Sequence, residues 1–229
     1  MVIKGLQKTT LLDFPQKLAC TVFTGGCNFR CPFCHNASLV LHAGGVEEIS
    51  EEEFFTYISK RKKMLDGVCI TGGEPLLCPD IENFIEKIKN EGLLVKLDTN
   101  GTFPKKLEYL LDNKLVDYVA MDIKNSKDKY AFTAGVEKFP AEIEESINLI
   151  ISKAPDYEFR TTVVKELHTP QDIVAIADWI KNAKKYFLQS YVDSGDTIQT
   201  GFSAYSAEEM LKILENTRVA LPVTELRGV

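Results

Sequence analysis

The chain has 229 residues, a formal net charge of −6, 45% hydrophobic residues and 26% charged residues. This is ordinary composition for a globular protein, and the length suits one domain with a sizeable core. The acidic balance argues against a nucleic-acid binder, which typically has a basic balance. Neither a signal peptide nor a membrane-spanning run is visible, and all six cysteines lie before residue 79. We therefore expect a cytoplasmic protein with reduced thiols and no membrane partner.

The chain alternates between apolar strands and helices that have one apolar face. The segment 1–17 holds short apolar pieces and is predicted to be an extended lead-in or hairpin. Runs of β-branched and apolar residues predict buried strands at 18–24, 68–71, 93–97, 116–123, 157–164 and 186–192. Capping residues and prolines predict helices that begin at Ser50, Asp80, Pro104, Pro140, Thr169 and Ser206. A long polar loop is expected at 125–135, and 221–226 are a candidate final strand.

Six strands that each precede a helix indicate an α/β fold with a parallel sheet and helical crossovers. Alternation alone allows either a doubly wound sheet or a barrel. Polar motifs follow several of the strands, as they do at the C-terminal rim where (β/α) barrel enzymes keep their active sites. Six units instead of eight predict an incomplete (β/α)6 barrel in a single domain, 1–229. Its parts would be the lead-in 1–17, the partial barrel 18–218 and a C-terminal tail 219–229.

Three cysteines follow the first predicted barrel strand within the string TGGCNFRCPFCHN. Cys27, Cys31 and Cys34 have C-x3-C-x2-C spacing, and thiolates this close in one loop can hold one metal centre. A set of cysteines suits zinc or iron–sulfur. A structural zinc site needs four ligands, and His35 is too near Cys34 to be an easy fourth. Spacing alone leaves open a zinc knuckle, a cluster completed by another cysteine, or a cubic cluster with one open iron.

The cysteine spacing, with Phe33 just before the third cysteine, resembles the signature of radical S-adenosylmethionine (SAM) enzymes. The longer string CNFRCPFCHN resembles the branch that activates glycyl radical enzymes, most of all the activating proteins of anaerobic ribonucleoside-triphosphate reductase. The resemblance implies one [4Fe-4S] cluster on the three cysteines, bound SAM, an incomplete barrel, and flavodoxin or ferredoxin as electron donor. It also implies a glycyl radical enzyme as partner. No further cysteines lie between Asn36 and Cys69, so a second cluster is not expected.

The string TGGEP follows the second predicted barrel strand. By itself it is often only a tight turn. Bare glycine backbone at Gly72 and Gly73 could also approach a ligand closely, with Glu74 accepting hydrogen bonds from an amine. The resemblance implies that these three residues hold the methionyl amino group of SAM.

Charged residues at the next strands form a second candidate group. Asp98 and Thr99 could belong to a plain turn, and Asp122 with Lys124 could be a surface ion pair, although the two share one face of a strand. An inward-pointing Arg160 would need an anion partner. The resemblance implies that Asp98, Lys124 and Arg160 contact SAM. It further implies a monovalent cation near Asp98, Thr99 and Asp122.

Other features depart from the resemblance or stay outside it. A histidine found late in some relatives is absent, and Gln189 is a candidate to contact the adenosyl group in its place. Cys20, Cys69 and Cys78 are expected to be buried thiols. The basic run KRKK at 60–63 is either a solvated helix face or a docking site for an acidic electron donor.

Together these observations predict a radical SAM enzyme that generates a glycyl radical on a partner, with anaerobic ribonucleoside-triphosphate reductase as the expected partner. Two alternatives remain at this point. One is a radical SAM enzyme for a small molecule, such as a 7-carboxy-7-deazaguanine synthase. The other is a metal-binding module without enzymatic activity.

Overall fold

One eight-stranded sheet organises the chain, and its strands lie side by side in the order of the sequence. The computed structural model describes residues 1–228. The strands are β1 (Ile3–Thr10), β2 (Ala19–Thr24), β3 (Gly67–Gly72), β4 (Leu94–Thr99), β5 (Tyr118–Asp122), β6 (Tyr157–Val163), β7 (Tyr186–Ser190) and β8 (Thr224–Arg227). Strand β1 pairs antiparallel with β2, and every later neighbour is parallel. The carboxyl ends of β2 to β7 therefore lie together at one rim of the sheet.

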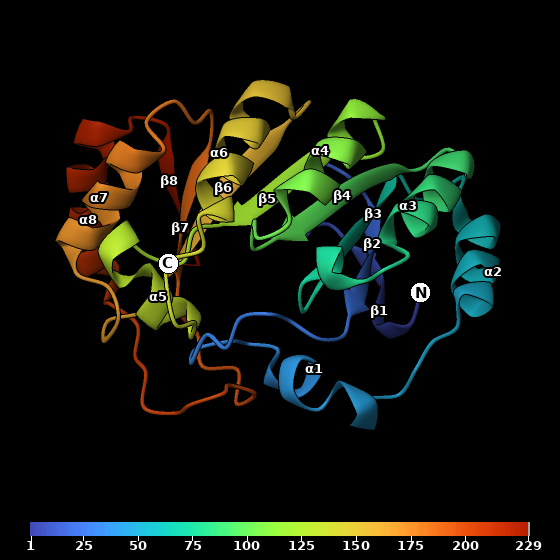
Figure 1. Ribbon diagram of the computed structural model, residues 1–229, viewed down its shortest axis with the longest axis horizontal. Helices are drawn as coiled ribbons and strands as arrows, with labels where there is room; N and C mark the ends of the chain where they lie inside the picture. The colour runs from blue at the N-terminus through green and yellow to red at the C-terminus, as the bar shows by residue number, and fades with distance from the viewer. Residues whose placement is uncertain (229) are drawn as a thin grey trace.

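The sheet curves into an open arch with its crossover helices on the outer side (Figure 1). The helices are α1 (Ala37–Leu41), α2 (Glu51–Arg61), α3 (Ile81–Asn90), α4 (Pro104–Asp112), α5 (Lys127–Ala134), α6 (Glu142–Lys153), α7 (Pro170–Trp179) and α8 (Ala207–Ala220), with 3-10 turns at Ala43–Gly45 and Pro75–Leu77. Strands β1 and β8 are the two edges of the sheet, and within residues 1–228 they do not pair with each other, so the barrel stays open. The prediction of an incomplete α/β barrel is thus confirmed.

Local sequence signals explain where several helices begin. Ser50, Thr169 and Ser206 each form a capping box in which the side chain accepts the amide of the residue three positions later. Such caps satisfy amides that have no partner inside the helix. Asp80 was also predicted to cap a helix, but its side chain makes no capping hydrogen bond. The buried residues of that helix, α3, are the four of its apolar face, which packs against the sheet: Ile81, Phe84, Ile85 and Ile88.

Two segments differ from the expectation, and the candidate final strand agrees with it. The predicted polar loop 125–135 contains helix α5, which ends at Gly135 in the left-handed conformation with φ of 66°. The helix was missed because its apolar pattern is weak: the ring of buried Tyr130 packs against Phe29 of the loop 25–36, and the hydroxyl of buried Thr133 accepts a hydrogen bond from Asn125. The short helix α1 was not predicted. At the other end, 221–226 does extend into a strand: β8 joins the sheet beside β7.

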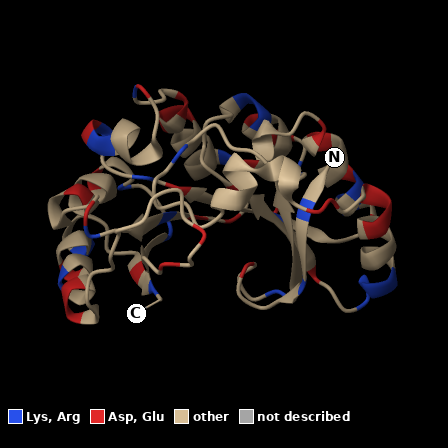
Figure 2. Ribbon diagram, turned by 90° about the horizontal axis from the view of Figure 1, so that it is seen from below, with Lys and Arg blue, Asp and Glu red and all other residues tan. Residues whose placement is uncertain are grey.

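The basic run Lys60 to Lys63 lies at the end of α2, which is acidic at its start and basic at its end, as Figure 2 shows at the outer side of the molecule. That order suits the helix dipole. Strand β3 begins only a few residues later, at Gly67. The run therefore lies at the amino-terminal end of the strands, opposite the rim where β2 leads into the cysteine loop.

None of the helices in residues 1–228 is long and apolar enough to cross a membrane.

Candidate functional site

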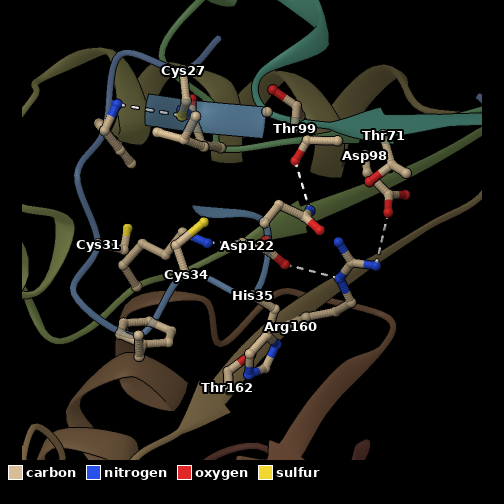
Figure 3. A pocket seen from close by; sticks show the side chains of 18 of the residues that line it. Cys27, Cys31, Cys34, His35, Thr71, Asp98, Thr99, Asp122, Arg160 and Thr162 are labelled. Atoms are coloured by element: carbon tan, nitrogen blue, oxygen red, sulfur yellow. Dashed lines mark hydrogen bonds and ion pairs between the residues drawn. The ribbon is translucent and has the colours of Figure 1, made fainter. Parts of the chain in front are cut away.

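The three cysteines lie on the loop between β2 and α1, which we call the cysteine loop (25–36). Cys27, Cys31 and Cys34 line one cavity of about 240 Å³ at the carboxyl ends of the parallel strands (Figure 3). The loop is folded locally: the amide of Phe29 donates to the sulfur of Cys27 (3.3 Å), and the amide of Cys34 donates to the carbonyl of Cys31 (3.0 Å). All three cysteines therefore border the same cavity, although their side chains are not drawn together into a preformed metal site within residues 1–228.

The chemistry of this donor set fits a metal–sulfur group. Burial raises the pKa of the Cys31 thiol to about 12 and also raises the pKa of Cys27. A buried thiol resists ionisation, but a coordinated metal removes the proton outright. The positive charge of Lys124, which lines the same cavity, opposes the upward shift at both cysteines. Three thiolate donors with a cation beside them suit an anionic iron–sulfur cluster that keeps one iron open.

Two later segments hold the cysteine loop in place. On one side, the amide of Arg30 donates to the carbonyl of Ala134 at the end of α5 (2.9 Å). On the other, the long β7–α8 loop (191–206) crosses over it, and the amide of Gln199 donates to the carbonyl of Pro32 (2.8 Å). Asp196 in that loop accepts hydrogen bonds from the backbone and hydroxyl of Ser38 in α1. The sequence carried no signal for either contact, because both are long-range.

Gly72 and Gly73 line the cavity, and close packing also requires that they have no side chains. A Cβ on Gly73 would lie 1.8 Å from the carbonyl oxygen of Gly26, and one on Gly72 would lie 2.4 Å from the amide nitrogen of Thr24. Gly72 also has a φ of +113°, which side-chain-bearing residues rarely adopt. Gly72 therefore lets the end of β3 pack directly against the end of β2, and Gly73 lets it pack against the cysteine loop.

Glu74 differs from the prediction that it faces a ligand amine. It is buried and does not line the cavity. Its carboxylate accepts hydrogen bonds from the amides of Asn100 (2.6 Å) and Leu76 (3.1 Å) and from the hydroxyl of Thr99 (2.8 Å). Burial raises the pKa of Glu74 to about 7, although these donors oppose the shift. Its role in this structure is to join the end of β3 to the end of β4.

A chain of alternating charges runs from the cavity into the barrel (Figure 3). Lys124 lies two residues beyond the end of β5 and donates to Asp122 (3.0 Å). The guanidinium of Arg160, in β6, donates to Asp122 (2.9 Å) and to Asp98 of β4 (3.2 Å). Burial alone would raise the pKa of Asp122, but Arg160 and Lys124 hold it well below its usual range. The predicted polar residues thus converge from three strands.

Sequence reasoning missed the continuation of this chain of charges. Lys96 is buried in β4 and pairs with Asp98. Deeper still, Arg227 of β8 binds the buried carboxylate of Glu158 through two hydrogen bonds of 2.7 and 2.8 Å. The signal was present, since Lys96 and Glu158 each lie two residues before a predicted site residue and therefore share its face of the strand.

The charged side chains that line the cavity balance one another. Lys124 and Arg160 pair with Asp98 and Asp122 there. Away from the cavity, Lys96 pairs with Asp98, and Arg227 pairs with Glu158. The cavity therefore presents both cationic and anionic groups to a ligand.

The expected monovalent cation finds no support in this arrangement. The guanidinium of Arg160 lies between Asp98 and Asp122 and binds both carboxylates. The hydroxyl of Thr99, the third expected ligand, donates to Glu74. Arg160 therefore already supplies the positive charge that such a cation would bring.

The remaining predicted residues take their places around the same cavity. Phe33 and Gln189 line it, so that Glu74 is the one predicted site residue that does not. Asn100, which was not predicted, also lines it and donates to the side chain of Asn28 (2.9 Å). His168 is buried behind the cavity, and its Nε2 lies 2.8 Å from the carbonyl oxygen of Lys124.

Comparison with known proteins identifies the family. The sequence model of the Radical SAM superfamily matches residues 21–180. The chain belongs to the radical SAM superfamily. MJ1227 of Methanocaldococcus jannaschii, provisionally named a glycyl-radical enzyme activating enzyme, is 35% identical over 198 residues, which cover 83% of this chain and 80% of that protein. This likeness places the chain in the activating-enzyme branch of the superfamily.

Further comparisons agree with this assignment. The pyruvate formate-lyase-activating enzyme of Clostridium pasteurianum is 33% identical over 131 residues, which cover 55% of this chain and 53% of that enzyme. Among solved structures, SuiB of Streptococcus suis bound to the precursor peptide SuiA matches 91% of this radical SAM chain with a TM-score of 0.72 and 16% identity. The match covers 48% of SuiB and shows that the two share a fold.

Proposed function

We propose that this radical SAM enzyme generates a glycyl radical on a partner protein, the large subunit of an anaerobic ribonucleoside-triphosphate reductase. One observation carries the proposal: Cys27, Cys31 and Cys34 share a single cavity with a network of paired cations and carboxylates. The cysteines would hold one [4Fe-4S] cluster in the cavity that Asp98, Asp122, Lys124 and Arg160 also line. That combination suits a ligand with both a carboxylate and an amine, as in the methionyl part of SAM.

The residues of the cavity divide the binding of SAM between them. Lys124 is the cation best placed for the carboxylate, because Asp122 is its one ion-pair partner in the described chain. Arg160 is held by two carboxylates and contributes a fixed positive charge. The exposed backbone at Gly73 would accept a hydrogen bond from the amine. Gln189 and Thr162, on the opposite wall, would contact the adenosyl group.

When bound, the cluster would supply one electron for the reductive cleavage of SAM, and this chemistry would remove one hydrogen atom from a glycine Cα of the partner to leave methionine, 5′-deoxyadenosine and the glycyl radical. The chain itself orients SAM and keeps water out. Buried walls such as Phe33 and Cys31 serve the second purpose.

The electron would come from flavodoxin or ferredoxin. The basic run at 60–63 lies at the opposite end of the strands from the cysteine loop. A donor docked there would be separated from the cluster by the whole barrel. We therefore expect the donor to dock beside the cysteine loop instead.

The test is to mix the anaerobically reconstituted enzyme, SAM and a reductant with the large subunit of an anaerobic ribonucleotide reductase. A glycine-centred radical in electron paramagnetic resonance (EPR) spectra supports the proposal. A silent reductase, together with fast SAM cleavage driven by a small metabolite, would instead assign the chain to the small-molecule radical SAM enzymes.

A further inference from the structure

His168 is a fully buried histidine that lies behind the cavity and does not line it. Buried polar groups are nearly always hydrogen-bonded, and both ring nitrogens of His168 have partners in the backbone. The amide of Val164 donates to Nδ1 (3.1 Å), and Nε2 lies 2.8 Å from the carbonyl oxygen of Lys124. One imidazole therefore joins the segments that follow two neighbouring strands, β5 and β6.

These contacts fix the tautomer of the ring. A nitrogen that accepts a hydrogen bond from an amide carries no proton, so Nε2 holds the proton and donates it to the carbonyl of Lys124. The carbonyl of Val164 also lies 3.2 Å from Nδ1, but it already accepts the amide of His168 (2.9 Å). Burial lowers the pKa of His168, although its backbone partners oppose the shift, and the ring stays neutral.

Both side chains that His168 supports belong to the wall of the cavity. Lys124 lines the cavity and donates to Asp122 (3.0 Å), so its ammonium and its carbonyl are held at two separate points. The imidazole also meets the ring of Phe33 edge-on, with centroids 6.4 Å apart. Phe33 lines the same cavity, immediately before Cys34. One buried residue thus supports both a cation and an aromatic ring of the site.

The backbone around Lys124 depends on this support because it lies beyond the sheet. Strand β5 ends at Asp122. Past that point, side chains hold the carbonyl groups: the hydroxyl of Thr161 donates to Ile123 (2.8 Å), and His168 donates to Lys124. His168 is therefore the contact that fixes the residue carrying the ammonium.

We propose that His168 is a positioning residue for SAM, which holds the backbone of Lys124 through Nε2–H and supports the ring of Phe33. The inference rests on the SAM binding proposed above. His168 does not touch SAM and acts through Lys124. An ammonium that is already held in place loses less freedom when a carboxylate binds to it. Loss of this hydrogen bond should therefore weaken SAM binding and leave the chemical step unchanged.

The test compares His168→Phe with His168→Gln in the full-length protein. Phenylalanine keeps a ring against Phe33 but removes both hydrogen bonds, whereas the amide of glutamine can still donate to Lys124. Thr217→Val is the matched control, because it removes a buried hydroxyl that donates to a backbone carbonyl, that of Ile213, away from the cavity. All proteins are reconstituted anaerobically, their iron is counted, and SAM binding is measured by calorimetry.

His168→Phe should keep its iron and raise the dissociation constant for SAM about tenfold, which equals about 1.4 kcal/mol. His168→Gln should recover most of the affinity, and Thr217→Val should match wild type. In assays of SAM cleavage, the change should appear in KM, with kcat unchanged at saturating SAM. A His168→Phe protein with full iron content and wild-type affinity would overturn the inference, and so would equal losses in His168→Phe and His168→Gln.

A double-mutant cycle tests whether His168 acts through Lys124. In a Lys124→Met background, His168→Phe should cause little further loss of SAM affinity, because the side chain that His168 positions is absent. The same tenfold loss in both backgrounds would show that His168 acts by another route and would overturn the inference.

A measurement on the wild-type protein keeps the proposal testable if His168→Phe folds poorly. The chain has three histidines, so nitrogen NMR spectroscopy of histidine-labelled protein with an oxidised cluster can resolve them, and His168→Gln identifies the signal. We expect the proton on Nε2 of His168, and a proton on Nδ1 would overturn the inference. A wild-type protein that binds neither a cluster nor SAM would instead overturn the proposed function.

Discussion

Glu74 provides a prediction that can be worked through from the structure. Its carboxylate is buried, and its pKa lies at about 7 in the fold, compared with an ordinary value of 4.5. Because the folded-state pKa is raised, the contribution of Glu74 to stability is greatest below pH 4.5 and is lost as the pH rises through 7. At about 1.4 kcal/mol per pKa unit, the total loss is about 3.4 kcal/mol. About two-fifths of it, about 1.4 kcal/mol, falls between pH 6 and 8.5 by the same linkage relation.

The perturbation is Glu74→Gln, which cannot ionise. The amide can replace only part of the three hydrogen bonds, so the variant should be less stable near pH 6 by about 1–3 kcal/mol. The difference in free energy of unfolding between Glu74→Gln and wild type should then be smaller by about 1.4 kcal/mol near pH 8.5. Anaerobic urea unfolding of the cluster-bound proteins at both pH values measures this change. Glu86→Gln, at an exposed position of α3, is the control and should follow wild type.

A constant gap between Glu74→Gln and wild type at both pH values would refute the reasoning. It would mean that the donors from Leu76, Thr99 and Asn100 keep Glu74 ionised throughout this range.

The remaining predictions concern the cluster and SAM. Cys31→Ala should lose the iron–sulfur cluster, because three ligands leave none to spare, whereas Cys69→Ala should keep it; four irons per Cys31→Ala chain would disprove the assignment. Lys124→Met should weaken SAM binding by about 2–5 kcal/mol, since a desolvated charge pair is lost, while its iron content stays intact because Asp122 still pairs with Arg160. Lys106→Met is the control, because Lys106 binds the carbonyl of Cys78 outside the cavity. If calorimetry finds the same SAM affinity for Lys124→Met as for the wild type and the control, Lys124 is not part of the SAM site.

The barrel and most of its site followed from local patterns in the sequence. Strands such as 18–24 are apolar runs that need no long-range information to recognise, and parallel pairing then brings their carboxyl ends to one rim. This is why residues as distant in the chain as Cys27 and Arg160 could be predicted to share a site.

What could not be predicted depends on packing between distant segments. Helix α5 is held by contacts of its buried Tyr130 and Ala134 with the cysteine loop, so its sequence has no clear apolar face. Glu74 was expected to face the ligand, but its orientation is decided by amides of the next strand end. The place of Arg160 between two carboxylates likewise depends on the register of three strands.

The central claim is that this enzyme produces a glycyl radical on a reductase. The most direct measurement is EPR spectroscopy of the large subunit of an anaerobic ribonucleotide reductase after incubation with this enzyme, SAM and a reductant. We predict a doublet from the single hydrogen left on the glycine Cα, collapsing to a singlet when that glycine is α-deuterated. A spectrum without this radical, obtained with a fully reconstituted cluster and a cognate reductase, would contradict the claim.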